Sequence, residues 1–573
     1  MTRTRATPPS PRTESLAPSR NETQLNHRSP ATAFAVALLD EFARLGLRDI
    51  VVSPGSRSQA LALAAAEYER VGLLRLRVRI DERVSGFLAL GLAVETGLPV
   101  VIVMTSGTAV ANLHPAVLEA HHSGVPLIIV SSDRPEELRG IGSNQTTVQE
   151  GIFGAAIGWS SEVPAPRGAP GEQDAAASLA RAAWAAARGG RPQPVHLNIA
   201  FTEPLSSPAE LPESEADWSA ESDEPIEPAA MRIQPSPGTV VIAGAGAGPR
   251  AEEVARQLGA PLLAEVASGA RFGPNLVVAY RELLDTANFG DRVERAIVFG
   301  HPTLTRQVPA LIQRDGVETI VVRSHAAEDY NPGHRVATFA DAVDVVGAAD
   351  ESPAARSWLG RWVTTSRGIL EPPAEPAAAE LGNAEFARRE LAAIRKPVDR
   401  RMLVEALWRA TWPHDRLVLG ASRLIREADD WVPGKKISVH ANRGLAGIDG
   451  TIATSIGIAL GSETDGTTRV LLGDLAALHD AGGMLFGVGE PRPRIQVIVG
   501  NDGGGTIFDG LEVAATAPQD AIDRVLLTPQ SVDFEALAAA YGWSYLRATN
   551  RGELDQALTA STGPTLIEVP LPR

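Results

Sequence analysis

Short β-rich runs alternate with stretches of helical length through most of this chain. The first series of alternating strand and helix segments, in chain order, is 49–53, 58–70, 74–80, 82–95, 100–105, 109–121 and 126–131. Such alternation predicts parallel strands that are joined by crossover helices. The same rhythm returns near residue 239 and again near residue 398. We therefore expect an α/β protein of three consecutive parallel-sheet domains.

Two stretches rich in Pro, Glu and Ala separate these units, and neither shows the periodicity of a helix or a strand. The N-terminal residues are rich in Arg, Pro, Ser and Thr and lack the apolar core of a secretion signal. The predicted organisation is a disordered tail over 1–29, a first domain over 30–204, an acidic linker over 205–235, a central Rossmann-like domain over 236–370, a second linker over 371–396 and a third domain over 397–573.

Composition excludes several classes of site and partner. The chain has 573 residues and no cysteine, so it has no disulfide, no thiolate metal site and no cysteine nucleophile. Its formal net charge of −16 disfavours nucleic acid and anionic membrane as partners. The apolar runs have the length of strands and fall short of the ~20 residues of a membrane-spanning helix. We expect a soluble, cytoplasmic protein.

Two acidic turns follow strands of the third predicted domain. Gly473-Asp474 ends one strand, and Asn501-Asp502 with three glycines ends the next. In open parallel sheets, ligands bind beyond the carboxyl ends of the strands. Mg²⁺ is usually held by one or two carboxylates together with phosphate oxygens, and glycines let the backbone approach a phosphate closely. The sequence therefore predicts a metal and diphosphate site made by Asp474, Asp502 and the carbonyl of Gly504.

A third acidic position lies far away, where Asp81-Glu82-Arg83 opens a predicted helix in the first domain. The helix that follows is apolar on nearly all sides, which predicts that its N-terminus is buried. Because burial favours the protonated form of a carboxyl group, Glu82 could hydrogen bond a ring nitrogen as an acid. An acid at a helix N-terminus is also common on protein surfaces, where the helix dipole stabilises it.

These loops together resemble the thiamine diphosphate-dependent enzymes. Gly473-Asp474 followed by Asn501-Asp502 resembles their metal-binding motif, and Ser106 to Asn112 resembles the glycine-rich stretch of their pyrimidine domain. The motif usually reads Gly-Asp-Gly and then Asn-Asn, so Leu475 and Asp502 depart from it, and Asn501 stays open as an alternative metal ligand.

Within that superfamily the chain is similar, from about residue 30 to its end, to the 2-succinyl-5-enolpyruvyl-6-hydroxy-3-cyclohexene-1-carboxylate (SEPHCHC) synthases of menaquinone biosynthesis. The segments that carry this likeness are 53–58, 81–83, 133–135, 144–145, 442–444 and 447–450.

The resemblance implies thiamine diphosphate with Mg²⁺ or Mn²⁺ as cofactors, and a homodimer or tetramer with active sites at the subunit interface. It implies decarboxylation of 2-oxoglutarate and conjugate addition of the succinyl unit to isochorismate, with Glu82 as the catalytic acid. The cofactor-binding residues would be Glu82, Asn112, Gln145, Ser422, Ile448, Gly473, Asp474, Asp502, Gly504 and Phe508. The substrate-binding residues would be Ser56, Arg57, Arg134, Asn144, Arg426, Arg443 and Leu511.

The arginines fit this expectation, because both substrates are dicarboxylates and a guanidinium pairs with a carboxylate bidentately. Arg57, Arg134, Arg426 and Arg443 all lie in or just after predicted strand-end loops. Arg306, in the central domain, occupies a region where the family has a basic residue, although this alignment is loose.

Other functions stay open at this point. A 2-oxoacid decarboxylase or an acetolactate-type synthase would use the same cofactor. An NAD-linked oxidoreductase would bind nucleotide at the loop Gly244 to Gly248, with Glu265 as the ribose-binding acid, although Pro249 stands where the fingerprint has its third glycine. A sensor that binds the cofactor without catalysis is a third possibility.

Overall fold

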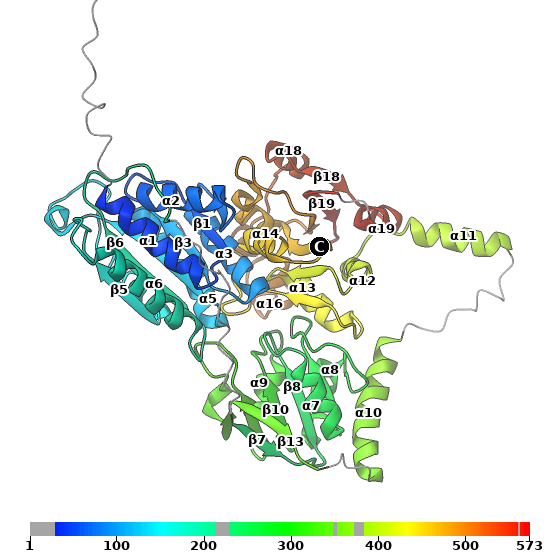
Figure 1. The fold of residues 1–573 in the computed structure, drawn as a ribbon. Coiled ribbons are helices and arrows are strands. Elements are labelled where there is room, and N and C mark those ends of the chain that lie inside the picture. Colours follow the sequence, from blue (N-terminus) through cyan, green and yellow to red (C-terminus); the bar gives the residue numbers. More distant parts are fainter. Residues whose placement is uncertain (1–28, 213–228, 348–351, 372–382, 560–561) are drawn as a thin grey trace, which may run out of the picture.

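The computed structural model describes residues 29–212, 229–347, 352–371, 383–559 and 562–573 (Figure 1). The predicted tail lies outside the described residues except for Ser29, which precedes the first helix, and half of the predicted acidic linker lies outside them as well. Among the described helices, none combines the length and the apolar character needed to cross a membrane.

The first sheet contains six parallel strands in the order β2-β1-β3-β4-β6-β5. Helices cover both of its faces, which explains why its central strands are apolar on both sides. The strands are β1 (Asp49–Val52), β2 (Arg75–Val78), β3 (Val100–Met104), β4 (Leu127–Asp133), β5 (Trp159–Val163) and β6 (Pro194–Ala200). The helices are α1 (Pro30–Arg44), α2 (Gln59–Arg70), α3 (Glu82–Thr96), α4 (Thr108–Ala111), α5 (His114–Ser123) and α6 (Glu172–Arg188).

The last sheet repeats this topology. Its order is β15-β14-β16-β17-β19-β18, which is the order of the first sheet with the strands renumbered. The strands are β14 (Arg416–Leu419), β15 (Ser438–His440), β16 (Thr468–Gly473), β17 (Ile495–Asn501), β18 (Ser544–Arg547) and β19 (Thr565–Pro570). Its main helices are α12 (Arg400–Ala410), α13 (Arg423–Trp431), α14 (Thr451–Gly461), α15 (Asp474–His479), α18 (Phe534–Ala540) and α19 (Arg551–Thr559). Two short helices, α16 (Val513–Thr516) and α17 (Gln519–Ile522), lie in the long connection after β17.

Between them in sequence lies a five-stranded parallel sheet of order β12-β11-β10-β8-β9, with a separate parallel pair of β7 and β13 (Figure 1). The strands are β7 (Ala230–Ile233), β8 (Thr239–Ala243), β9 (Leu262–Ala264), β10 (Arg295–Phe299), β11 (Glu318–Val322), β12 (Thr338–Ala340) and β13 (Ala342–Val345). Its helices are α7 (Arg250–Leu258), α8 (Tyr280–Asp285), α9 (Gln307–Ile312) and α10 (Pro353–Leu370). The prediction of three parallel-sheet α/β units is confirmed.

Local details differ from the sequence-based expectations. β7 lies inside the stretch predicted as an acidic linker, because its four residues pair in parallel with β13. The helix α11 (Asn383–Ile394) lies inside the second predicted linker, where Ala, Glu, Arg and Leu favour a helix despite the neighbouring prolines. The single helix predicted over 109–121 is two helices, since α4 ends at Ala111 with Asn112 as its C-cap and Pro115 lies in the first turn of α5.

The first and third sheets are joined by the packing of α3 against α14. A Cβ atom at Gly91 would lie 1.9 Å from the Thr454 carbonyl oxygen, and one at Gly457 would lie 2.2 Å from the Leu88 carbonyl oxygen. The two helices therefore approach each other at backbone distance, which only glycine permits. A single buried apolar cluster runs through this contact and contains residues of both domains.

Candidate active site

Glu82 is the first residue of α3, and Asp81 caps this helix by accepting a hydrogen bond from the Arg83 amide at 2.9 Å. Asn112 Nδ2 donates to Glu82 Oε2 at 3.4 Å. The prediction that this end of the helix is buried is wrong for the single chain, because Glu82 is only half-buried although the next two turns are buried. The Glu82 carboxyl and the exposed Asn112 amide lie together on an accessible face of the first domain.

A hydrogen-bond network in the first domain connects three of the predicted site residues, Arg134, Asn144 and Gln145, with Ser106. Gln145 Nε2 donates to the Ser106 carbonyl at 3.0 Å, and Ser106 Oγ donates to the Gln145 carbonyl at 2.8 Å. Arg134 donates to Ser106 Oγ and to the Asn144 carbonyl, both at 2.9 Å. Gln145 has a φ of 55°, which is costly for a residue other than glycine and is typical of functional sites.

Arg57 and Arg134 form a buried pair of like charges. Arg57 donates to the Phe201 carbonyl at 3.0 Å, but its buried Nε has no hydrogen-bond partner among the described residues. Burial, assisted by the charge of Arg134, lowers the pKa of Arg57. A carboxylate placed between the two guanidinium groups would relieve both effects. Ser56, beside Arg57, is exposed.

On the third domain, the two predicted metal ligands lie close together at the ends of β16 and β17. Asp474 is buried, and burial together with the charge of Asp502 raises the pKa of Asp474 to about 6. The amides of Leu475 and Gly504 donate hydrogen bonds to its carboxylate. Two buried carboxylates this close repel each other, and a divalent cation would remove the repulsion.

The glycine turn after β17 has backbone conformations that disfavour other residues, and at Gly504 it also leaves no room for a side chain. Gly503 and Gly504 have φ values of 81° and 132°, and a Cβ atom at Gly504 would lie 2.1 Å from the Leu527 carbonyl oxygen. The described residues contain no group of three or more His, Cys, Asp or Glu side chains that could together hold a metal ion. A cation held by Asp474 and Asp502 would therefore take its other oxygens from the backbone and from a diphosphate, as Mg²⁺ commonly does. The residues present fit such a pair of ligands.

Asp502 is oriented by two residues that the sequence did not point to. Arg400, at the start of α12, donates to Asp502 Oδ2 at 2.7 Å, and the Thr506 hydroxyl donates to the same oxygen. Asn501, the alternative ligand, uses its amide to bind Glu568 Oε1 at 2.8 Å. Arg400 lies 102 residues from Asp502 in the sequence, so no local sequence pattern predicts this contact. Both contacts to Asp502 engage Oδ2, so they leave Oδ1 as the oxygen available to a cation.

Arg426 and Arg443 form a second pair of like charges, at the junction of the third and central domains. Ser422 caps α13 through its hydroxyl, and Arg426 of the same helix donates to the Ser422 carbonyl at 2.9 Å. Arg443 is buried and donates through Nε and Nη2 to the hydroxyl of Thr303 in the central domain. Burial lowers the pKa of both arginines, and each pKa is lowered further by a neighbouring positive charge. The four predicted substrate arginines thus form two pairs on different domains.

The apolar side chains that were predicted to contact the cofactor or substrate lie at or near the surface of the chain. Ile448 and Leu511 are exposed, and Phe508 is half-buried. Arg306 is exposed and forms an ion pair with Glu512 at 2.6 Å, beside Leu511.

The structure argues against the alternative prediction that the glycine loop Gly244 to Gly248 of the central domain binds a nucleotide. A ribose-binding acid must present its carboxylate to the ligand. Glu265 is instead buried, and its Oε1 accepts hydrogen bonds from the amides of Thr303 at 2.8 Å and Leu304 at 2.7 Å. A Cβ atom at Gly244 would meet the Pro302 amide at 2.1 Å, so this glycine serves the packing of two loops of the domain.

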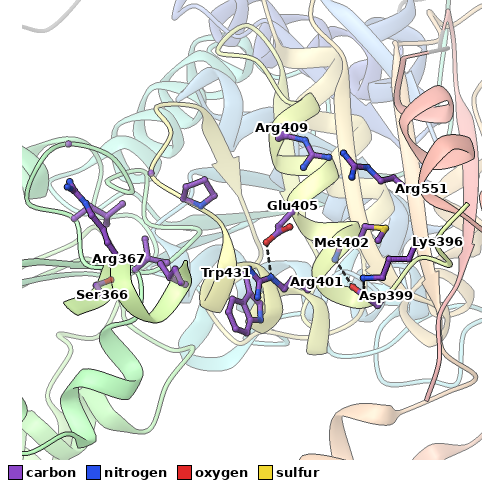
Figure 2. Close-up of a pocket in the computed structure, with 16 residues that line it drawn as sticks. Ser366, Arg367, Lys396, Asp399, Arg401, Met402, Glu405, Arg409, Trp431 and Arg551 are labelled. Carbon is purple, nitrogen blue, oxygen red and sulfur yellow. Dashed lines mark hydrogen bonds and ion pairs between the residues drawn. The ribbon is translucent and has the colours of Figure 1, made fainter. Parts of the chain in front are cut away.

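A cavity of about 800 Å³ lies apart from all these residues, between the central domain and α12 (Figure 2). Four of its seven charged side chains are paired with one another: Arg401 bonds Glu405 at 2.8 Å and lies over the Trp431 ring, and Lys396 lies 3.5 Å from Asp399. None of the predicted cofactor or substrate residues lines it. It is therefore distinct from the candidate site, although Arg400 of the same helix reaches Asp502.

Comparison with known proteins agrees with this geometry. Residues 33–156 match the N-terminal thiamine pyrophosphate-binding domain of thiamine pyrophosphate enzymes, and residues 432–569 match the C-terminal one. A SEPHCHC synthase of Leifsonia xyli is 57% identical, with 95% of this chain and 97% of that protein covered. Another from Clavibacter michiganensis is 56% identical over 98% of this chain and all of the other. The chain belongs to the SEPHCHC synthase family.

Members of the SEPHCHC synthase family are thiamine diphosphate-dependent transferases of menaquinone biosynthesis, and this chain is such an enzyme. A more distant member, from Kineococcus radiotolerans, is 44% identical over 93% of this chain and 94% of its own. Among solved structures, benzoylformate decarboxylase from Polynucleobacter necessarius superposes with a TM-score of 0.63 at 17% identity, and covers 95% of this chain and 99% of that one. That likeness shows the fold alone.

Proposed function

We propose that this enzyme decarboxylates 2-oxoglutarate and adds the succinyl unit to isochorismate, in an active site shared by two copies of the chain. The observation that carries the proposal is the presence of two arginine pairs, Arg57 with Arg134 on the first domain and Arg426 with Arg443 on the third, which are the domains similar to thiamine pyrophosphate-binding domains. Both proposed substrates are dicarboxylates, and buried arginines are suited to bind them. An enzyme for pyruvate would need fewer cations.

The cofactor would be held at its two ends. Asp474 and Asp502 would hold Mg²⁺ or Mn²⁺ and, through it, the diphosphate, while Arg400 keeps Asp502 in place. Glu82 would hold a proton against the aminopyrimidine ring, and Asn112 orients the Glu82 carboxyl. When bound, thiamine diphosphate supplies the electron sink for the loss of carbon dioxide. The arginines would position both acids during the reaction.

A shared site explains why the Glu82 half of the site is accessible in the single chain. Large apolar side chains are exposed beside the predicted cofactor residues on both domains. Contact with a second copy of the chain would cover these side chains. The exposed apolar side chains are Ile80 before Glu82, Ile141 and Val148 on either side of Gln145 in the sequence, and Leu445 with Ile448 on the third domain. In a symmetric dimer, the Glu82 face of one copy would close on the Asp474 face of the other, and a tetramer would repeat this arrangement.

The direct test is an assay with purified protein, thiamine diphosphate, Mg²⁺, 2-oxoglutarate and isochorismate. We expect loss of isochorismate absorbance, release of carbon dioxide and a product with the mass of the succinyl adduct. Carbon dioxide release from 2-oxoglutarate without consumption of isochorismate would show a decarboxylase instead. Preference for pyruvate over 2-oxoglutarate would contradict the proposed substrate class.

A further inference from the structure

Glu265 is a buried carboxyl group for which the proposed reaction has no use. It follows β9 in the central domain and is 2% exposed. Its Oε1 accepts the amides of Thr303 and Leu304, whereas its Oε2 is buried and has no hydrogen-bond partner among the described residues. A buried carboxylate oxygen without a partner is costly, so the neutral form of this group is favoured.

Glu265 binds the backbone amide of Thr303, and the side chain of the same threonine binds Arg443. The Thr303 hydroxyl accepts hydrogen bonds from Arg443 Nε at 2.9 Å and Nη2 at 2.6 Å. Glu265 thus fixes the peptide of Thr303, and Thr303 fixes the guanidinium of Arg443. This relay joins the central domain, which has no cofactor motif, to the arginine pair of the third domain.

The charges around Glu265 come from both domains. Burial is the main reason that its pKa is raised, to about 8, and the charge of Asp429 raises it further. Arg443 acts in the opposite direction. Below about pH 8 the group is therefore neutral in the folded protein. Other ionisable groups interact electrostatically with Glu265 or with its neighbours Asp429 and Arg443; they are Glu119, Arg271, Tyr280, Arg281, His301, Tyr330, Arg426 and Asp430.

We propose that Glu265 is a positioning residue for carboxylate binding, which in its neutral form fixes Arg443 through Thr303 and leaves the charge of the Arg426–Arg443 pair free for the substrate. When Glu265 ionises, it becomes an internal anion beside Arg443 and competes with the carboxylate of the substrate. The inference rests on the proposed function, because it takes Arg426 and Arg443 as substrate-binding residues.

The test compares the wild-type enzyme with Glu265→Gln between pH 6.5 and 9. The glutamine keeps an acceptor for the Thr303 and Leu304 amides and cannot ionise. For the wild type, we expect the KM of a carboxylate substrate to rise roughly threefold or more from pH 7 to pH 9, with little change in kcat. For Glu265→Gln, the KM should stay near the wild-type value at pH 7. An equal rise of KM in both proteins would overturn the inference.

A second pair of variants tests the relay itself. Thr303→Val removes the acceptor of Arg443 and should raise the KM several-fold at every pH, whereas Thr303→Ser keeps the hydroxyl and should restore it. A KM that is unchanged in Thr303→Val would contradict the relay.

Thermal unfolding gives a readout that does not depend on activity. Because the folded pKa of Glu265 lies above its usual value of 4.5, the wild type should lose stability relative to Glu265→Gln as the pH rises from about 4.5 to about 8, with a constant difference above pH 8. A difference independent of pH would overturn the neutral state of Glu265. An inactive wild type that still shows this pH dependence would contradict the proposed function and leave the protonation of Glu265 established.

Discussion

Asp474 is a buried carboxyl group that must be ionised to hold a divalent cation. Burial and the charge of Asp502 raise its pKa to about 6, so the proton and the cation compete for it. We predict that the affinity for Mg²⁺ and thiamine diphosphate is full well above pH 6 and falls below it, by up to about tenfold per pH unit. Titration calorimetry between pH 5 and pH 8 measures this, with Asp474→Asn as the control that loses the cation. An affinity independent of pH over this range would argue against Asp474 as a ligand.

In the proposed site, Glu82 binds the other end of the cofactor. Glu82→Gln preserves the hydrogen bond with Asn112 but removes the acidic proton. We predict a loss of turnover of at least about a hundredfold, with the affinity for Mg²⁺ and cofactor changed only a few-fold, since the diphosphate contacts are untouched. Steady-state kinetics and a binding titration on the same preparation separate the two effects. Turnover comparable to the wild type would exclude the proposed role.

At the scale of single residues, some contacts could be predicted from the sequence and others could not. Asp474, Asp502 and Gly504 could be placed together, because the ends of parallel strands meet at one edge of a sheet and β16 pairs with β17. Arg400 and Thr303 could not be found, since each reaches its partner across more than a hundred residues without a local pattern. The expected burial of Glu82 was wrong for one chain, because the surface that would cover it does not belong to the same copy in the arrangement we propose.

Among the helices, the contact of α3 with α14 aligns the two cofactor-binding domains within the chain. Gly91→Ala would place a methyl group 1.9 Å from the Thr454 carbonyl oxygen, and helix backbones cannot yield easily. We predict a destabilisation of about 2 kcal/mol or more. The matched control is Gly360→Ala in α10, where no atom lies within 4 Å of the new methyl group. The control should stabilise the protein by about 0.5 to 1 kcal/mol. Urea denaturation compares the two, and equal effects would contradict the close approach of the helices.

The alternation of strands and helices predicted the elements well because a strand buried on both faces is apolar throughout and a crossover helix must follow it. The wrong predictions concern elements whose formation depends on contacts with distant parts of the chain. β7 is too short to be seen without β13, and the break after α4 depends on Pro115 within an otherwise helical run. That break leaves the Asn112 side chain beside Glu82.

The whole molecule contains the same sheet order twice, in its first and its last domain. The family models of thiamine pyrophosphate-binding domains match these two parts of the chain, and in the proposed site each domain supplies one end. Two similar domains of this kind can pair with each other within one chain and again between copies. The central domain contributes Thr303, which holds Arg443, so all three domains take part in the proposed site.

The central claim is that one cofactor is held by Glu82 of one copy and Asp474 of another. Mixing Glu82→Gln protein with Asp474→Asn protein under conditions that exchange subunits tests it directly. Half of the dimers in an equal mixture contain both variants, and each such dimer has one intact site of two. The account therefore predicts recovery of about a quarter of wild-type activity from two inactive proteins. A mixture that stays inactive, although native mass spectrometry shows mixed dimers, would contradict it.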